Sequence, residues 1–345
     1  MSDSTPGAPE PTASTSTVET SEPAWRRVLR GPLGRNVGLV LALVLIVAAG
    51  AVTAGNDFTS WNNALVILRQ ASIIGVISIG MTLVITAGGI DLSVGSVLGL
   101  ASIVATLDAT QAFVRESHWV VMIIIAIAVG ITAGFINGVV IAYGRVAAFM
   151  ATLAMLVAAR GLAEILAERR TLIVGSRPFI DFMNADYIGV DVLIWIFIIV
   201  AAAGWILLNR TTFGRRTVAI GGNREAARLA GINVNRHMVW LYLIAGLTAG
   251  IAAVMMLGRT TAGTSTHGTL YELDAIAAVV VGGTLLIGGR GTIVGTVFGV
   301  LIFATLTNVF VQNNLPSSVQ AVAKGAIIVI AVLLQQRFAR RETRT

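Results

Sequence analysis

The side chains that could carry out acid–base, nucleophilic or metal chemistry are few in this chain and lie far apart. The three histidines do not have metal-ligand spacing, and the absence of cysteine excludes thiolate nucleophiles, thiolate metal sites and disulfides. A phosphate-binding loop needs a lysine followed by serine or threonine, yet the only lysine, Lys324, is followed by Gly325. We therefore expect no metal site, no ATP hydrolysis by that chemistry and no enzymatic activity.

Asp91 stands at the start of an apolar run, two residues after the glycine pair Gly88-Gly89. A carboxylate in such a position can cap the N-terminus of the following helix. Alternatively, it could accept hydrogen bonds from a solute or form a gate, with Arg290 as its partner when the inner gate is shut. Both interpretations stay open on the sequence alone.

Five further charged residues lie at or within apolar runs. Glu272 and Asp274 begin one run, where they could cap a helix, line an entrance or dock a partner protein. We favour the entrance or docking role at the outer end of that run. Lys324 lies within the last run, and because an unpaired charge is costly in a membrane we expect a structural ion pair there. Arg160 and Glu164, one turn apart, are expected to pair with each other.

Several uncharged polar side chains also lie within apolar runs, where each must find a hydrogen-bond partner. Neighbouring helices are the commoner source of such partners, and a transported solute is the other. The candidate residues of a translocation pathway or gate are Thr82, Gly88, Gly89, Asp91, Ser93, Glu272, Asp274, Arg290 and Asn308.

The longest connection between apolar runs, residues 209–237, contains Gly221-Gly222-Asn223-Arg224-Glu225-Ala226-Ala227-Arg228-Leu229-Ala230-Gly231. Asn223 can cap a short helix whose first turn holds Glu225, and Gly231 can end that helix in the left-handed conformation. A short rigid helix with small side chains suits docking into a groove of another protein. An amphipathic linker resting on anionic lipid is the alternative.

The elements that carry these residues are long apolar runs. Of the 345 residues 56% are hydrophobic and only 12% are charged, with a mean hydropathy of +0.85, which excludes soluble enzymes, nucleic-acid binders and disordered scaffolds. We predict an all-α polytopic membrane protein with about ten transmembrane helices. The predicted spans are 37–55, 63–86, 92–108, 119–142, 146–166, 189–208, 238–257, 274–288, 292–311 and 318–335.

The basic residues predict how these spans are oriented. With ten spans both termini share one side, and sixteen of the 24 basic residues fall on that side against five on the other. Because cytoplasmic loops are enriched in Lys and Arg, we expect both termini in the cytoplasm and the chain in the inner (plasma) membrane. The net charge of +7 lies in short blocks between apolar runs, so it does not indicate a nucleic-acid partner.

The domain organisation follows from the same pattern. Residues 1–35, rich in Ser, Thr, Pro and Glu in their first part, are predicted to be a disordered cytoplasmic tail. Residues 36–336 form the transmembrane domain, with 209–237 as its large cytoplasmic loop, and 337–345 form a cytoplasmic C-terminal tail. We expect the run from Val37 to be a true first span rather than a cleaved signal peptide.

Two glycine-rich segments 200 residues apart resemble each other, 88–99 and 288–299. Internal repeats are common in transporters, whose pathways often lie between the repeats. With ten spans the two segments run in the same direction, whereas inverted repeats require opposite directions. Glycines spaced by four, such as Gly130/Gly134 and Gly246/Gly250, predict a closely packed bundle.

Several ordered motifs in this chain resemble one family. The Glu225-Ala226-Ala227…Gly231 pattern is similar to the coupling-loop motif of permease subunits of ATP-binding-cassette (ABC) importers. The stretches 80–96, 144–153, 271–284 and 323–328 resemble the ribose/xylose/arabinose permease family. The resemblance covers roughly residues 35–337.

The resemblance implies a type II importer-like fold and import of a monosaccharide, a pentose or a hexose. It also implies a second permease copy in a homodimer, an extracytoplasmic sugar-binding protein and a separate ATPase subunit. ATP and Mg would be bound by that ATPase, so no cofactor is expected on this chain, whose apolar faces would contact membrane lipid. A secondary transporter driven by an ion gradient is the alternative function, and another small solute such as a furanone or polyol would share every motif.

Overall fold

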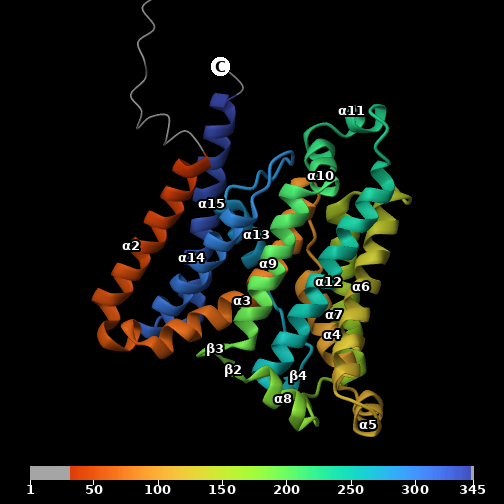
Figure 1. Ribbon diagram of the computed structural model, residues 1–345, viewed down its shortest axis with the longest axis vertical. Helices are drawn as coiled ribbons and strands as arrows, with labels where there is room; N and C mark the ends of the chain where they lie inside the picture. Colours follow the sequence, from red (N-terminus) through yellow and green to blue (C-terminus); the bar gives the residue numbers. More distant parts are fainter. Residues whose placement is uncertain (1–31, 343–345) are drawn as a thin grey trace, which may run out of the picture. The chain divides into compact units, whose positions relative to one another are not determined.

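The computed structural model describes residues 32–342; most of the predicted N-terminal tail and residues 343–345 lie outside this range. The chain divides into two units, residues 1–37 and 38–345, and the description below concerns the second. Most of that unit is helical, with two short antiparallel β-ladders (Figure 1).

The helices follow one another along the chain with short connections. They are α2 (Pro32–Thr59), α3 (Trp61–Thr86), α4 (Val94–Thr106), α5 (Asp108–Glu116), α6 (Val120–Ala142), α7 (Ala148–Ala167), α8 (Arg177–Met183), α9 (Val192–Arg210), α10 (Thr212–Gly222), α11 (Arg224–Leu229), α12 (Val234–Thr260), α13 (Tyr271–Val281), α14 (Ile293–Gln312) and α15 (Ser317–Glu342). The ladders pair β1 (Leu172–Ile173) with β4 (Ala262–Gly263), and β2 (Asp186–Tyr187) with β3 (Val190–Asp191).

The all-α polytopic prediction is confirmed, whereas the count of ten spans is not. Within residues 32–342, seven helices are long and apolar enough to cross a membrane, or eight if α4 and α5, bent by 55°, count as one. The number of candidate spans is lower than the predicted ten partly because α4 has only 13 residues and α13 only 11. Such helices are about 20 and 16 Å long, well short of the roughly 30 Å hydrocarbon core.

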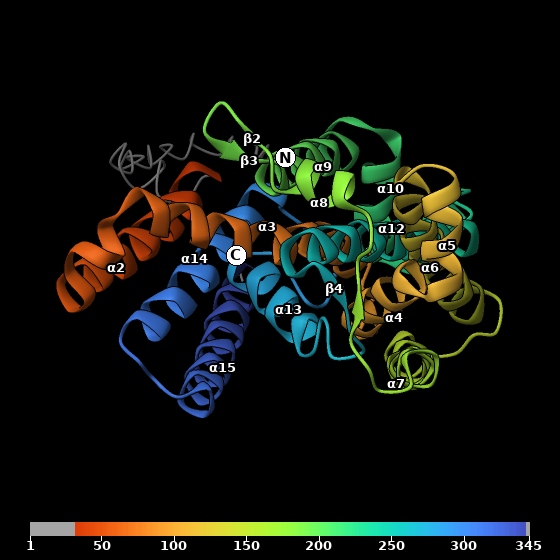
Figure 2. The same ribbon diagram turned by 90° about the horizontal axis from the view of Figure 1, so that it is seen from below.

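Helices α3 and α12 form the centre of the bundle. In their most apolar stretches 61% and 78% of the residues are buried, against 22% in α7 and 6% in α2. Viewed from below, α12 lies between α3 and α6 (Figure 2). A helix that is apolar all round and buried in this way occupies a core, while the exposed apolar faces of α2 and α7 suit contact with lipid.

The predicted close packing of glycine-spaced helices is confirmed between α6 and α12. A side chain at Gly130 would overlap the backbone of Gly246 and Gly250, and one at Gly134 would overlap the backbone of Tyr242. The two backbones can approach this closely because neither helix presents a side chain at these positions.

The similarity between segments 88–99 and 288–299 has a structural counterpart. Gly88 (φ +77°) and Gly288 (φ +87°) both adopt the left-handed conformation that favours glycine. A few residues after each turn a helix begins, α4 at Val94 and α14 at Ile293. Both helices run away from the end of the bundle that carries α11 (Figure 1), so the two segments share one direction and do not form an inverted repeat.

The basic residues separate between the two ends of the bundle. We call these the α11 end, with α10 and α11, and the α8 end, with α5, α8 and the β-ladders (Figure 1). The residues predicted for the far side lie in α5, α8, the last turn of α12 and the connection between α7 and β1, at the α8 end: Arg115, Arg169, Arg170, Arg177 and Arg259. At the opposite end, helices α10 and α11 together contribute four arginines, Arg215, Arg216, Arg224 and Arg228.

Candidate functional site

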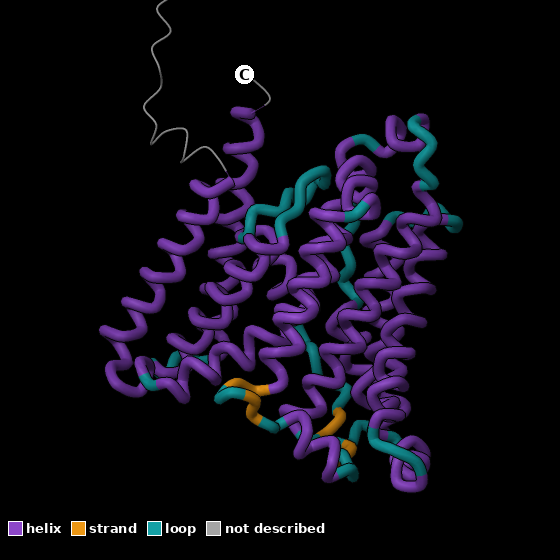
Figure 3. The backbone as a smooth tube through the Cα atoms, in the orientation of Figure 1, coloured by secondary structure: helices purple, strands orange, loops and turns teal. Residues whose placement is uncertain are grey.

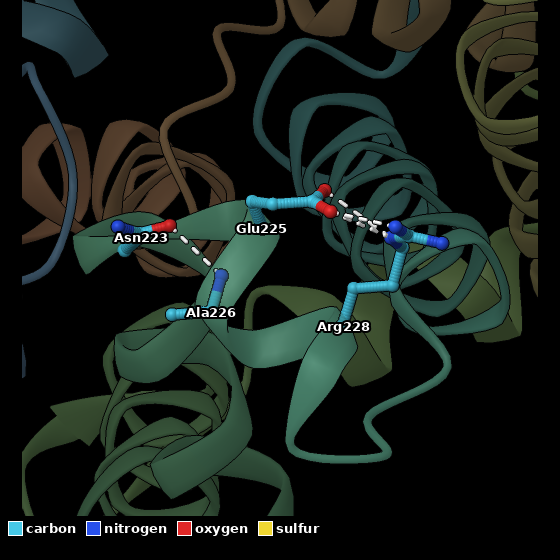
Figure 4. A network of polar contacts seen from close by, with 4 residues as sticks. All are labelled: Asn223, Glu225, Ala226 and Arg228. Atoms are coloured by element: carbon cyan, nitrogen blue, oxygen red, sulfur yellow. Dashed lines mark hydrogen bonds and ion pairs between the residues drawn. The ribbon is translucent and has the colours of Figure 1, made fainter.

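Helix α11 is the short capped helix that the sequence predicts. The Asn223 side chain accepts a hydrogen bond from the Ala226 amide at 2.9 Å, and Gly231 follows the helix with φ +82°. The Arg228 guanidinium donates to both carboxylate oxygens of Glu225 at 2.6–3.2 Å (Figure 4). The cap, the acidic first turn and the glycine stop are all confirmed.

The polar face of α11 is open to solvent. The side chains of Glu225 and Arg228 are 65% and 66% exposed, and Arg224 is exposed as well. Hydrogen bonding to Arg228 lowers the pKa of Glu225, and Glu225 raises the pKa of Arg228, so both stay charged at neutral pH. Ala227, in contrast, is buried. Helix α11 therefore packs against the rest of the protein through this small side chain, and its charged side chains remain exposed to solvent.

The last turn of α10, directly before α11, packs against the two glycine turns, which also contact each other. The Gly289 amide donates to the Thr86 carbonyl oxygen at 2.9 Å. A side chain at Gly221 would overlap the backbone of Thr86 and the amide of Gly289. One at Gly288 would come within 2.8 Å of the Gly88 nitrogen and 2.9 Å of the Gly221 oxygen. The structure thus brings Gly221, predicted for the coupling loop, against Thr86 and the Gly288–Gly289 turn, and that turn in turn contacts Gly88, which was predicted for the pathway.

Asp91 is buried in the extended stretch between α3 and α4. Its carboxylate accepts hydrogen bonds from the Ser93 amide at 2.9 Å and the Ser93 hydroxyl at 2.6 Å, and Asn137 donates to the same hydroxyl at 2.9 Å. The N-cap residue of α4 is Ser93, so of the two roles that the sequence left open for Asp91 the N-cap role is wrong. The carboxylate is bonded to Ser93 and positions this cap residue, and the gate with Arg290 stays a prediction.

The N-termini of the short helices α4 and α13 meet inside the bundle. A side chain at Gly95, in the first turn of α4, would overlap the backbone of Gly268 and the carboxylate of Glu272. Glu272 is buried in the first turn of α13. Its side chain is therefore packed against α4 and is not exposed at a surface. Non-helical stretches lead into both helices, visible as teal segments among the purple helices (Figure 3).

Arg160 holds the non-helical stretch before α13 in place. Its guanidinium donates to the carbonyl oxygens of Ser265 and His267, the latter at 2.9 Å. Glu164 instead pairs with Arg169 at 3.6 Å. The predicted Arg160–Glu164 pair is wrong, because the turns before α13 offer backbone carbonyl oxygens that the Arg160 guanidinium can satisfy.

Two further basic side chains, Lys324 and Arg69, form ion pairs with carboxylates of other elements. Lys324 of α15 donates to both carboxylate oxygens of Asp274 in α13 at 3.1 Å, which confirms a structural ion pair. Asp274 thus faces α15. Arg69 of α3 pairs with Asp191 at the start of α9. Each pair joins two elements and gives each of its charges a partner of opposite sign.

The polar residues Thr82 and Asn308 find their partners on neighbouring helices. The Thr82 hydroxyl lies 2.8 Å from the Thr296 hydroxyl, between α3 and α14. Asn308 and Asn63 exchange two side-chain hydrogen bonds of 2.8 and 3.0 Å. Of the two kinds of partner expected for these polar side chains, a neighbouring helix or a transported solute, the structure shows the neighbouring helix.

Three functional candidates were missing from the sequence-based site: Gly288, Gly289 and Asn137. The similarity of segment 288–299 to segment 88–99 already pointed to the two glycines, because Gly88 and Gly89 were selected. Asn137 had no such signal beyond being polar within an apolar run. Among the described residues, no group of three or more His, Asp or Glu could hold a metal ion.

Comparison with known proteins adds a family match over most of the bundle. Residues 63–332 match the family described as branched-chain amino acid transport system / permease component. The chain is 39% identical over 302 residues to the ribose import permease protein RbsC of Escherichia coli K12, covering 86% of this chain and 92% of that protein. No solved structure matches the chain.

Two further relatives carry similar names. The ribose import permease protein RbsC of Bacillus subtilis is 42% identical over 308 residues, 88% of this chain and 92% of that protein. The L-arabinose ABC transporter permease protein AraH of Azospirillum brasilense is 32% identical over 333 residues, 95% of this chain and 94% of that protein.

Proposed function

The chain belongs to the branched-chain amino acid transport system / permease component family, and to the sugar ABC transporter permeases within it. From this premise we propose that it imports a monosaccharide, a pentose or hexose, into the cytoplasm. A separate ATPase subunit drives the movement and an extracytoplasmic sugar-binding protein delivers the sugar. ATP and Mg are bound by the ATPase, and this chain carries no cofactor. A second copy of the chain completes the pathway as a homodimer.

The observation that carries the proposal is the geometry of α11. A capped helix displays Arg224, Glu225 and Arg228 beyond the apolar bundle, and a helix of this kind suits a groove on a partner protein. The turn before α11 contacts the two glycine turns that precede α4 and α14. A partner that moves α11 therefore acts close to both short connections into the bundle.

The distribution of charge supports the orientation of the chain. Arginines are concentrated at the α11 end, where α10 and α11 carry four of them. The positive-inside rule assigns that end to the cytoplasm, where an ATPase would bind, and the α8 end to the outside, where a binding protein would dock. We accordingly place both termini in the cytoplasm, as the count of basic residues predicts.

The test is uptake of labelled sugar by proteoliposomes that contain the chain, its ATPase and its binding protein. We expect uptake to require ATP and the binding protein. The Glu225→Arg variant places a cation where α11 presents an anion, and we expect it to lose ATPase association and uptake while still inserting. Glu116→Arg, an exposed glutamate at the α8 end, is the control and should retain ATPase association. Normal association and uptake in Glu225→Arg would contradict the proposal.

The alternative function is a secondary transporter driven by an ion gradient. The buried carboxylates of Asp91 and Glu272 favour it, because such transporters use ionisable groups within the membrane. A protonophore separates the two. Uptake that persists with ATP after the proton gradient is collapsed supports the importer. Uptake that stops with the gradient and ignores ATP supports the alternative.

A further inference from the structure

Backbone atoms from three separate segments meet at one point of the α11 end. We call this contact the glycine junction and define it by Thr86, Gly88, Gly221, Gly288 and Gly289. Its hydrogen bond runs from the Gly289 amide to the Thr86 carbonyl oxygen at 2.9 Å. Around that bond, added side chains at Gly221 or Gly288 would come within 3.0 Å of backbone atoms from the other segments. No side chain separates the segments.

Each segment of the junction leads to a different element. Thr86 ends α3, and Gly88 begins the stretch that leads through Asp91 to α4. Gly288 and Gly289 lie in the connection from α13 to α14. Gly221 lies in the last turn of α10, two residues before the Asn223 cap of α11.

The contacts at the junction are rigid because they join backbone to backbone. A displacement can be absorbed by a long side chain that changes its rotamer, but a close-packed backbone contact offers no such freedom. Coupling between distant sites is carried through packed groups of this kind when they have more than one arrangement. A shift of α10 and α11 must therefore displace both glycine turns or break the junction.

We propose that the glycine junction transmits the movement of α11 to the turns that precede α4 and α14, so that both helices shift together when the ATPase subunit moves α11. Gly221 is the positioning residue of this junction, because a side chain there would overlap backbone atoms of both Thr86 and Gly289. The inference rests on the proposed function and adds the route by which the ATPase acts on the bundle.

The chain offers a matched pair of variants. Gly221 and Gly222 are adjacent, both lie in α10 and neither has a positive φ. A side chain at Gly221 would overlap backbone atoms of both other segments, whereas one at Gly222 would meet nothing within 4 Å. Alanine suits a helix better than glycine at either position. A defect confined to Gly221→Ala therefore reports the junction and not helix propensity.

The first experiment measures ATPase binding, ATP hydrolysis and sugar uptake in the reconstituted complex. We expect Gly221→Ala to bind the ATPase as the parent chain does, while sugar imported per ATP hydrolysed falls about 5- to 150-fold, the usual range of an allosteric coupling. Gly222→Ala should match the parent chain. Equal coupling ratios in the two variants would overturn the inference, and so would loss of ATPase binding by Gly221→Ala, which would make Gly221 a docking residue.

The second experiment measures movement with the junction intact. Because the chain has no cysteine, spin labels can be attached to single introduced cysteines without removing native ones. Suitable exposed positions are Val218 in α10, Ile287 beside the second glycine turn and Tyr143 after α6. We expect the 218–287 distance to stay constant between the nucleotide-free and the ATP–vanadate states of the whole complex, while the 218–143 distance changes.

The opposite pattern, a changing 218–287 distance, would overturn the inference, as would no change in either distance. These outcomes differ from failure of the proposed function, which would appear as a parent complex without ATP-dependent uptake.

Discussion

Asp91 and Arg160 are charged side chains whose hydrogen bonds serve non-helical backbone inside the bundle. Asp91 fixes the Ser93 cap of α4, and Arg160 satisfies two carbonyl oxygens of the stretch that leads into α13. Non-helical backbone at membrane depth is tolerated only where protein groups or water satisfy it. Both residues therefore have a structural role, which is to stabilise the stretches that lead into the short helices α4 and α13.

Substitution of Asp91 separates these two roles. Asn keeps an oxygen that can accept from the Ser93 amide and hydroxyl, so we expect Asp91→Asn to insert with nearly unchanged thermal stability in detergent. Asp91→Ala leaves those donors unpaired and should lose about 1–3 kcal/mol of stability.

Transport by the same variants tests whether the charge of Asp91 matters. We expect Asp91→Asn to lower uptake while it remains folded, because the carboxylate would act as a gate or a sugar acceptor. Unchanged uptake and unchanged basal ATPase coupling in Asp91→Asn would leave Asp91 with a purely structural role.

Among the helices, α13 and α4 are the ones that the surrounding elements must hold in place. Each is too short to cross the membrane alone, and each is tied by groups from a distant segment. For α13 the tie is the Asp274–Lys324 pair with α15, whose side chains are 16% and 21% exposed. For α4 it is the glycine contact with Gly268 and the Ser93 hydroxyl that Asn137 of α6 reaches.

Removing one member of the Asp274–Lys324 pair should destabilise the contact between α13 and α15. Lys324→Met leaves the Asp274 carboxylate without its partner, at an expected loss of the order of 3 kcal/mol in thermal unfolding. The double variant Lys324→Met/Asp274→Leu should recover most of this loss, since it removes both charges. Additive losses in the double variant would show that the two residues do not interact.

At the level of the whole molecule, the bundle has two chemically different ends. The α11 end holds the glycine junction and a cluster of arginines, while the α8 end holds the β-ladders and short helices. An importer requires this asymmetry, because its ATPase and its binding protein act from opposite sides of the membrane.

Cysteine labelling tests the orientation directly. Leu229 in α11 and Ile188 in the β2–β3 turn are both well exposed, at 77% and 93%, and lie at opposite ends. With a membrane-impermeant maleimide we expect Ile188→Cys to react in intact cells and Leu229→Cys to react only in inside-out vesicles. The reverse pattern would invert the assigned topology.

The membrane class, the long apolar helices and the form of α11 could be read from the sequence, whereas the short helices α5, α8 and α10 and the shortness of α4 and α13 could not. The features that could be read depend on local signals. Apolar runs identify helices in lipid because every backbone group must be satisfied within its own segment. The cap, acidic first turn and glycine stop of α11 involve residues three to eight positions apart, a separation at which local geometry fixes the partners.

The tertiary structure alone decided which segments meet. The partners of Arg160, Lys324 and Asn308 lie 105, 50 and 245 residues away, and no local pattern encodes such a distance. A local rule misassigned Arg160 to Glu164, because a buried guanidinium takes the strongest unpaired acceptors that packing brings to it. The glycine pairs were visible in the sequence, but only the folding of α3, α10 and the α13–α14 connection around a common point brought them into contact.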